Sequence, residues 1–521
     1  MVLTGSPGVG KTSVAGRIVA RLRDQGWTVV LHSGRWNPEA LLESLADALA
    51  AESTMDQVAR LLRDPAVDDA GKLGVVRQLL RARRLLLVFD GLEQNLSGYG
   101  DGFADAGFGE VLRALATATG KGRLLVTSRD LLPGDLDLTR VDIAPLTARE
   151  AERLVERMPG LRGLAADVRA EVLRAVGVQP RLVELADALA RDGAAEFADT
   201  LAGLGRAPAE ACAQLVAALL KRRTHGEREA LLQAGTCLSP LSTGDLAVAL
   251  HGPHVGAFDT DDAARALAVL VDLALVARLD DGRHVAQPWV GEAVAAHHDG
   301  GAGQRHARAI TVHDRRRRTG VGGFDDLSET VRHLTGTRRF AEVATVAIGG
   351  LDDLPGALAR AALLNQVTRA LPADTPGYLE LVYRELDELG GLGLAGAALA
   401  RATEALGGAR RAAAQRPTDL AAQRGLSLLL SRAGELELAA GRQEAAEALF
   451  REDLAGTERL VATHPRHPVL RRDLSVCHER LGEVGWPRAR RRRRSGTSCA
   501  AWPSCGSWPT PPRRTGSCAA T

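Results

Sequence analysis

Residues 1–22 read MVLTGSPGVGKTSVAGRIVARL, and this stretch decides the fold of the first part of the chain. Its spacing satisfies GxxxxGK[ST], with apolar residues before the motif and apolar residues at helical spacing after it. The sequence therefore predicts a strand, a phosphate-binding loop and a helix. Glycines let backbone N–H groups face a phosphate, lysine supplies a compact positive charge, and threonine can bind Mg²⁺ through its hydroxyl. The predicted loop is Gly5, Ser6, Pro7, Gly8, Val9, Gly10, Lys11, Thr12 and Ser13.

Two later apolar runs end in polar residues that a phosphate site needs. The run LLLVF (85–89) ends in Asp90, and the run LLV (124–126) leads to Arg129. Short continuous hydrophobic runs are typical of strands buried on both faces of a parallel sheet. We predict Asp90 and Thr12 as Mg²⁺ ligands and Arg129 as a sensor of a terminal phosphate, because the carboxyl ends of such strands meet at one edge. Strands alternate with helices over residues 1–143, which predicts a parallel, doubly wound α/β sheet.

From residue 144 onward the apolar period becomes 3.6 without strands, which predicts a helical segment. Thr147 and Glu150 have the spacing of a capping box, and Pro180 is placed to open another helix. Residues 238–288 then give two helical patterns, the turn DDG (280–282) and a short extended run. This order of helix, helix and β-hairpin predicts a winged helix.

The C-terminal part contains an internal repeat. The stretches QRPTDLAAQRGLSLLLSRAGE (415–435) and THPRHPVLRRDLSVCHERLGE (463–483) align at an offset of 48 residues, with Pro417 on Pro465 and Gly434 on Gly482. A fixed period with glycine between two helices is typical of a helical solenoid. The units resemble tetratricopeptide repeats of an extended bacterial kind. We therefore expect antiparallel helix pairs that bind a protein partner.

Composition bounds the class of protein. The 521 residues are 45% hydrophobic but only 3% aromatic, and Ala, Leu and Arg dominate, which favours helix over sheet. No apolar run reaches about 18 residues and no secretory signal opens the chain, so we predict a cytoplasmic protein without a membrane partner. The six cysteines show no CxxC pairing, and Cys212 and Cys237 have apolar helical neighbours that predict core positions.

Both ends of the chain are unusual. Only four residues precede the loop, which leads us to expect a start internal to a longer ancestral chain. From residue 486 on there are eight Arg and no acid, and removing these charges from the formal net charge of +2 leaves −6 for residues 1–485. We expect this basic tail to be disordered and to be the product of a frameshift, because it breaks the repeat.

Six stretches occur in an order and spacing that resemble the STAND class of P-loop NTPases, which includes the NACHT and NB-ARC relatives. They are GSPGVGKT (5–12), LLLVFDGLEQ (85–94), RLLVTSR (123–129), PLTAREAERL (145–154), GVQPRLVELA (177–186) and VAQPWVGEAV (285–294). The resemblance covers residues 1 to about 298. It implies a switch that holds ATP or ADP with Mg²⁺. In such a switch the helical segment and winged helix close over the nucleotide, and ATP exchange opens the molecule for homo-oligomerisation.

The resemblance also implies roles for single residues. Lys11 would contact phosphate, Arg129 would sense the γ-phosphate, and Pro180 would lie on the adenine side. Where the family often has a second acid, this chain has Gly91, and Glu93 is the nearest candidate base. Gln287 stands where the winged helix usually offers a histidine to the β-phosphate of ADP. We therefore expect slow ATP hydrolysis and a less tightly held closed state.

These patterns divide the chain into six segments. They are a P-loop NTPase domain of the AAA ATPase type (1–143), a helical lid domain (144–205), a winged helix (206–298), a helical linker (299–370), tetratricopeptide-like repeats of about 48 residues (371–485) and the basic tail (486–521).

Three functions compete at this stage. The leading hypothesis is a signal-transduction switch that couples an ATP- or ADP-binding core to a protein-binding solenoid. The alternative is a transcriptional regulator that uses the winged helix on DNA, which the acidic balance of residues 1–485 and the apolar stretch DDAARALAVLVDLAL (261–275) argue against. The third is an AAA+ machine with processive turnover, for which no arginine finger is identified.

Overall fold

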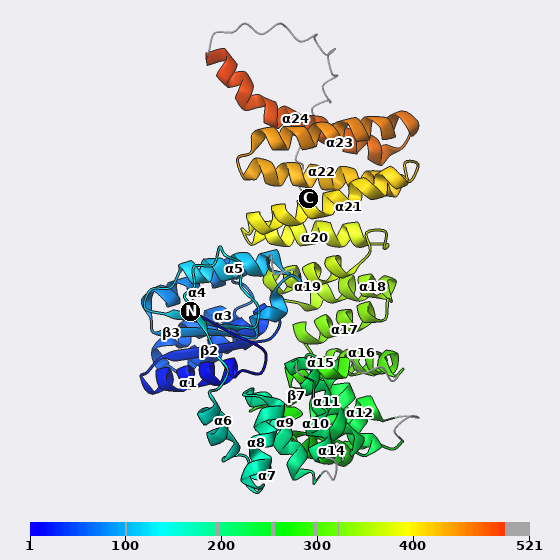
Figure 1. Cartoon of the computed structure of the whole chain (residues 1–521). Helices are drawn as coiled ribbons and strands as arrows, with labels where there is room; N and C mark the ends of the chain where they lie inside the picture. Colours follow the sequence, from blue (N-terminus) through cyan, green and yellow to red (C-terminus); the bar gives the residue numbers. More distant parts are fainter. Residues whose placement is uncertain are drawn as a thin grey trace, which may run out of the picture. The chain divides into compact units, whose positions relative to one another are not determined.

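The computed structural model describes residues 1–98, 102–193, 197–205, 207–251, 256–295, 300–320 and 322–494. A parallel sheet comes first, then a helical segment, then a helix pair with a hairpin, and finally helices alone (Figure 1). The chain divides into two compact units, Met1–Arg432 and a second unit that begins at Ala433. None of the helices in the described ranges combines the length and the apolarity needed to cross a membrane.

The sheet has five parallel strands in the order β2-β3-β4-β1-β5, so β4 lies between the strand before the loop and the strand that ends in Asp90. The strands are β1 (Val2–Thr4), β2 (Thr28–Ser33), β3 (Leu85–Asp90), β4 (Arg123–Ser128) and β5 (Arg140–Asp142). The helices between them are α1 (Lys11–Asp24), α2 (Pro38–Ala50), α3 (Asp56–Arg63), α4 (Asp69–Ala82) and α5 (Ala106–Thr117), with the 3₁₀ turns η1 (Ser53–Met55) and η2 (Leu92–Asn95).

Alternating side chains of β3 explain why helices cover both faces of the sheet. Leu86 and Val88 pack in one cluster with Ala15 of α1. Phe89 points to the other face, where its ring lies 6.1 Å from that of Phe108 on α5. Successive strand residues face opposite sides, so a strand that is apolar at every position needs a helical layer on each. The predicted doubly wound sheet is confirmed.

The helical segment contains α6 (Ala148–Val155), α7 (Pro159–Arg162), α8 (Ala166–Val176), α9 (Pro180–Arg191) and α10 (Phe197–Ala202). Thr147 and Glu150 form the predicted capping box at the start of α6, and Pro180 is the first residue of α9 as predicted. The next segment contains α11 (Pro208–Lys221), α12 (His225–Thr236), α13 (Thr243–Leu250), α14 (Thr260–Asp272), β6 (Val276–Arg278), β7 (His284–Ala286) and α15 (Pro288–Ala295).

The order α13, α14 and an antiparallel β6–β7 hairpin is the order that the sequence predicts for a winged helix. A bridge between Leu241 and His284 attaches the hairpin to the residues before α13. The apolar residues of α14 are buried, among them Leu267 and Leu270. This helix therefore spends its apolar face on the core of its own domain.

The following helices are α16 (Ala302–Arg318), α17 (Phe324–Gly336), α18 (Phe340–Gly350) and α19 (Ala357–Ala370), with the turn η3 (Leu351–Asp353). Two carboxylates of the sheet domain reach the first turns of later helices whose own N-cap residues provide no side-chain bond. Asp69 accepts from Leu358 N of α19 at 2.8 Å, and Glu110 accepts from Ala397 N at 2.9 Å. These bonds replace the missing caps and hold the helices against the sheet domain.

The repeat appears directly in the helix bounds. The helices are α20 (Tyr378–Gly391), α21 (Ala395–Gln415), α22 (Leu420–Ala439), α23 (Gln443–Thr463) and α24 (Pro468–Arg494). α21 and α23 begin and end 48 residues apart, and α22 and α24 begin 48 residues apart. Gly393 and Gly441 precede α21 and α23 with φ of 72° and 77°, values that favour glycine. The predicted helical solenoid is confirmed, while its protein partner stays a prediction.

The predicted tail begins inside α24, which runs on to Arg494, so the helix continues into the stretch for which we expected disorder. Residues 495–521, which hold the remainder of that tail, lie outside the described residues.

Candidate functional site

The predicted loop connects β1 to α1 and folds around the side chain of its own lysine. Lys11 Nζ donates to the carbonyl oxygens of Gly5 at 2.9 Å and Ser6 at 3.1 Å. Gly10 adopts φ 102° as the residue before α1, a conformation that favours glycine. Burial lowers the pKa of Lys11, while the carboxylates of Glu93 and Asp90 act to raise it. The ammonium thus stands among loop carbonyls at the helix N-terminus, where a phosphate would be attracted.

Gly8 is required because two elements approach the loop closely. A Cβ at this position would lie 2.9 Å from Cβ of Arg181 and 3.1 Å from the ring of Trp289, and the residue has φ +73°. Arg181 N also donates to Gly8 O at 3.4 Å. The loop is therefore in contact with α9 and with α15, as the predicted closure of the helical segment and winged helix requires.

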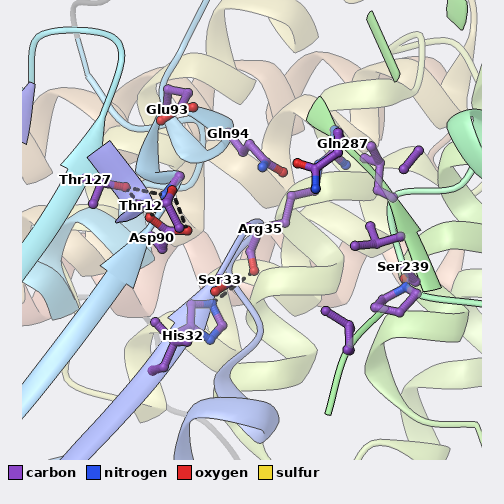
Figure 2. Close-up of a pocket in the computed structure, with 18 of the residues that line it drawn as sticks. Thr12, His32, Ser33, Arg35, Asp90, Glu93, Gln94, Thr127, Ser239 and Gln287 are labelled. Atoms are coloured by element: carbon purple, nitrogen blue, oxygen red, sulfur yellow. Dashed lines mark hydrogen bonds between the residues drawn. The ribbon is translucent and has the colours of Figure 1, made fainter. Parts of the chain in front are cut away.

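Asp90 lies at the centre of a hydrogen-bond network at the carboxyl edge of the sheet (Figure 2). Thr12 Oγ1 donates to its two carboxylate oxygens at 3.0 and 3.2 Å, and Thr127 Oγ1 donates to Oδ1 at 2.6 Å. Gly91 N in turn donates to Thr127 Oγ1 at 2.9 Å. Thr127 therefore orients Asp90, which it reaches because β4 lies between β1 and β3.

Glu93 and Arg129 lie beside this network and contact each other. Arg129 N donates to Glu93 Oε2 at 3.3 Å, and Arg129 Nε lies 3.7 Å from Glu93 Oε1. Arg129 Nη1 also pairs with Glu292 of α15. Partial burial opposes the charged form, yet the hydrogen bond and charge of Glu292 raise the pKa of Arg129. The predicted phosphate sensor is thus held by one carboxylate of its own domain and by one of the winged helix.

A cavity of about 730 Å³ lies in front of these side chains. Pro180 and Gln287 line it, and in Figure 2 Gln287 faces Thr12 and Asp90 across the opening. Gln179 Nε2 donates to Ser6 Oγ at 3.2 Å, which joins the residue before Pro180 to the loop. Eleven of the predicted site residues line the cavity: Pro7, Gly8, Gly10, Lys11, Thr12, Ser13, Asp90, Glu93, Arg129, Pro180 and Gln287.

The other three predicted loop residues support the loop from behind. The carbonyls of Gly5 and Ser6 accept from Lys11, as described above, and Val9 is buried. Sequence reasoning missed Glu292, Arg181 and Trp289, because each meets the site through a contact between segments far apart in the chain. The pairing of Arg129 with Glu292, for example, joins residues 163 positions apart.

The residues fit a nucleotide with Mg²⁺. Positive φ at Gly8 and Gly10 shapes a backbone cradle, Lys11 brings the positive charge, and Thr12 and Asp90 present adjacent oxygen atoms. Mg²⁺ prefers hard oxygen ligands of this kind, with substrate phosphates completing its shell.

Comparison with known proteins gives distant structural similarities. No protein-family model and no curated protein matches the sequence. The chain is similar to the crystal structure of a signal transduction ATPase with numerous domains (STAND) and a tetratricopeptide repeat sensor from Pyrococcus horikoshii. The identity is 14%, the match covers 95% of this chain and 82% of that chain, and the TM-score is 0.44. It is also similar to a Walker-type ATPase of Pyrococcus abyssi, with 15% identity over 57% of this chain and 90% of that chain and a TM-score of 0.29.

Proposed function

We propose that the protein is a STAND-type signal-transduction switch whose state depends on whether ATP or ADP is bound. The observation that carries this proposal is the convergence of Lys11, Thr12 and Asp90 on one cavity whose far wall is built by the helical segment and winged helix. A nucleotide in such a cavity contacts three segments at once. Its γ-phosphate can therefore bias how they pack.

The chain's residues divide the work of holding Mg²⁺ and nucleotide. Lys11 and the loop amides bind phosphate oxygens, and Thr12 and Asp90 hold the cation, with Thr127 keeping the Asp90 carboxylate oriented. Bound Mg²⁺ neutralises phosphate charge. Pro180 and Gln287 lie on the opposite wall, where the base and the β-phosphate side would be read.

Slow turnover is part of the proposal. Gly91 occupies the position next to Asp90, and Glu93 is paired with Arg129 rather than free to take a proton from water. A general base must reach its water with an available lone pair and a suitable orientation. A switch that hydrolyses slowly keeps its ATP state long enough to act.

The Arg129–Glu292 pair suggests how the nucleotide state is reported. Arg129 can hold either the winged-helix carboxylate or an additional phosphate, but a γ-phosphate at the cavity would compete for the same guanidinium. Losing Arg129 weakens the attachment of α15. The solenoid would then become available to protein partners and the molecule to homo-oligomerisation, in keeping with the six-segment division proposed above.

The winged-helix order is the observation that favours the alternative, a DNA-binding regulator controlled by ATP. Leu267 and Leu270 of α14 are buried, which removes much of that helix from a groove-reading role. Retention on duplex DNA that falls steeply with salt would support the alternative over the switch.

Hydrogen exchange of the full chain without nucleotide, with Mg²⁺–ADP and with Mg²⁺–ATP tests the switch. We expect both nucleotides to protect residues 5–12, and ATP to leave residues 288–295 less protected than ADP does. The variant Lys11→Ala should show neither effect. Equal exchange of residues 288–295 in the ADP and ATP samples, with the loop protected in both, would leave a nucleotide-binding protein that is not a switch.

A further inference from the structure

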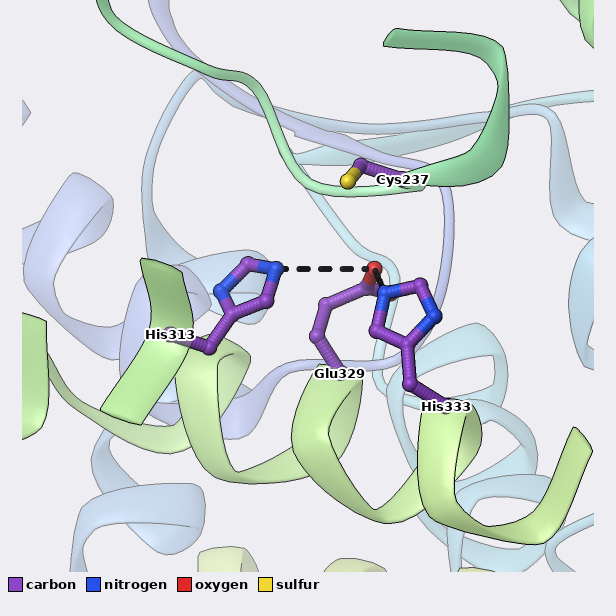
Figure 3. A group of neighbouring side chains, drawn as sticks. All are labelled: Cys237, His313, Glu329 and His333. Atoms are coloured by element: carbon purple, nitrogen blue, oxygen red, sulfur yellow. Dashed lines mark ion pairs between the residues drawn. The ribbon is translucent and has the colours of Figure 1, made fainter. Parts of the chain in front are cut away.

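Four buried side chains outside the phosphate site present metal-ligating atoms to one another. They are Cys237, His313, Glu329 and His333, whose ligand atoms all lie within 4.8 Å of each other (Figure 3). Their exposed fractions are 4%, 0%, 3% and 0%, so water does not compete for these atoms. Polar groups this deeply buried need partners, and a cation is one that satisfies all four.

Three elements bring these side chains together. Glu329 and His333 are four residues apart on α17, so they lie on the same face of that helix. His313 comes from α16, which is packed against α17, and Cys237 is the residue at which α12 ends. The sequence separations explain why no local motif such as CxxC marks the cluster.

The two histidines are already oriented for ligation by bonds at their other nitrogen atoms. His313 Nδ1 bonds Asp326 Oδ1 at 2.8 Å, and His333 Nδ1 bonds His306 Nδ1 at 2.8 Å. His313 Nε2 has no hydrogen-bond partner among the described residues, although the side chain is fully buried. A carboxylate behind a histidine is the arrangement that fixes the tautomer of metal ligands and makes them more basic.

The spacing of the donors matches a tetrahedral site. Glu329 Oε2 lies 3.3 Å from His333 Nε2 and 3.9 Å from His313 Nε2. Donors that are about 2.0–2.3 Å from a tetrahedral Zn²⁺ lie roughly 3.3–3.7 Å from each other. The cluster therefore needs movements of about 1 Å or less, and its mixture of nitrogen, sulfur and oxygen donors is one that Zn²⁺ accepts.

The charges within the cluster favour a cation. Burial lowers the pKa of His333 to about 4, which leaves a neutral imidazole as a metal requires. Burial raises the pKa of Cys237 to about 12, and Glu329 contributes in the same direction. A coordinating metal deprotonates such a thiol, so thiolate, carboxylate and a divalent cation together are neutral.

Arg332 competes with a cation for the same carboxylate. Its Nη2 lies 2.7 Å from Glu329 Oε2 and 3.1 Å from His333 Nε2, while its Nε lies 3.1 Å from Glu329 Oε1. The same Nη2 also donates to Thr236 O at 2.6 Å. Arg332 can therefore keep Oε1 and the Thr236 carbonyl while Oε2 turns to a metal. The other arrangement is a permanent Arg332–Glu329 ion pair without metal.

We propose that Cys237, His313, Glu329 and His333 form a binding site for one Zn²⁺ ion. The site fixes the connector between α12 and α13 to α17. Leu238 N bonds Glu329 Oε2 at 3.1 Å, and Leu238, Ser239 and Glu329 also line the cavity in front of the phosphate loop. The ion would thus stiffen one wall of that cavity. The site does not depend on nucleotide binding.

Metal analysis of the full chain tests the site directly. After purification without a histidine tag and dialysis against a weak chelator, we expect about one Zn²⁺ per chain by elemental analysis. Replacing it with Co²⁺ should give the intense absorption of a thiolate–Co²⁺ bond together with the visible bands of tetrahedral Co²⁺. A wild-type chain that retains no Zn²⁺ and gives neither absorption overturns the proposal in favour of the Arg332–Glu329 pair.

Two variants and a matched control assign the ligands. Cys237→Ser should lose the thiolate absorption, whereas Cys212→Ser, which changes another buried cysteine far from the cluster, should keep it. Asp326→Asn should weaken Co²⁺ affinity by about 10–100-fold with the stoichiometry unchanged, because Asp326 orients His313 without touching the metal. An unchanged thiolate absorption in Cys237→Ser would overturn the assignment, as would equal Co²⁺ affinity in Asp326→Asn and the wild type.

Discussion

Replacing Asp105 by asparagine should stabilise helix α5 at neutral pH and have little effect at acidic pH. Asp105 is the N-cap of α5, and its carboxylate accepts from Phe108 N at 3.1 Å. Burial raises the pKa of Asp105 to about 6 in spite of the bond from Phe108, and the charge of Glu385 on α20 raises it further. Arg369 acts in the opposite direction but does not cancel these effects.

The sign follows from proton binding. An acid with a higher pKa in the folded than in the unfolded chain favours the folded state when protonated, so stability falls as pH rises from about 4 to about 6. A rise of about two pKa units corresponds to at most about 3 kcal/mol at pH 7.5. Asparagine is an equally good N-cap and carries no charge. Asp105→Asn should therefore gain about 1–3 kcal/mol at pH 7.5 and almost nothing at pH 4.

The assay is hydrogen exchange of peptides that cover α5, since exchange measures the free energy of local opening. Asp68→Asn is the matched control, because Asp68 caps α4 through Gly71 N but is exposed to solvent. We expect its effect to stay within about 0.5 kcal/mol at either pH. A loss of stability in Asp105→Asn at pH 7.5, or the same change at both pH values, would refute the reasoning.

Two further predictions concern the repeats and the metal ligand. A Cβ at Gly434 would lie 2.3 Å from the buried ring of Phe450, so Gly434→Ala should lower the urea midpoint, by about 1–3 kcal/mol, whereas Gly482→Ala, with no heavy atom of the described residues within 4 Å, should raise it slightly. Asp90→Ala should abolish the Mg²⁺ dependence of ADP binding in calorimetric titrations while keeping part of the affinity, because the loop amides remain; unchanged Mg²⁺ dependence would place the cation elsewhere.

The sequence allowed the fold and half of the phosphate site to be predicted for local reasons. The loop motif, the buried run before Asp90 and the capping box at Thr147 are patterns within a dozen residues, where spacing alone sets the geometry. The 48-residue offset likewise predicted helix bounds, since equivalent residues end equivalent helices.

The contacts that could not be predicted join distant segments. Glu292 pairs with Arg129 only because the winged helix packs against the loop domain, and neither position has a local signal for it. Cys237 looked like an ordinary core residue, because its apolar neighbours are close in sequence while His313 and Glu329 are not. Disorder from residue 486 was expected from composition, whereas α24 continues to Arg494.

The most direct test of the nucleotide site is thermal unfolding with and without Mg²⁺–ADP for the wild type, Lys11→Ala and Lys121→Ala. Lys121 is an exposed lysine outside the cavity, so it controls for the loss of a lysine. ADP at about 100 times its dissociation constant should add roughly 2.7 kcal/mol to the wild type and to Lys121→Ala, and nothing to Lys11→Ala. Equal stabilisation of Lys11→Ala and the wild type, or none in any of the three proteins, would contradict nucleotide binding at the loop of residues 5–12.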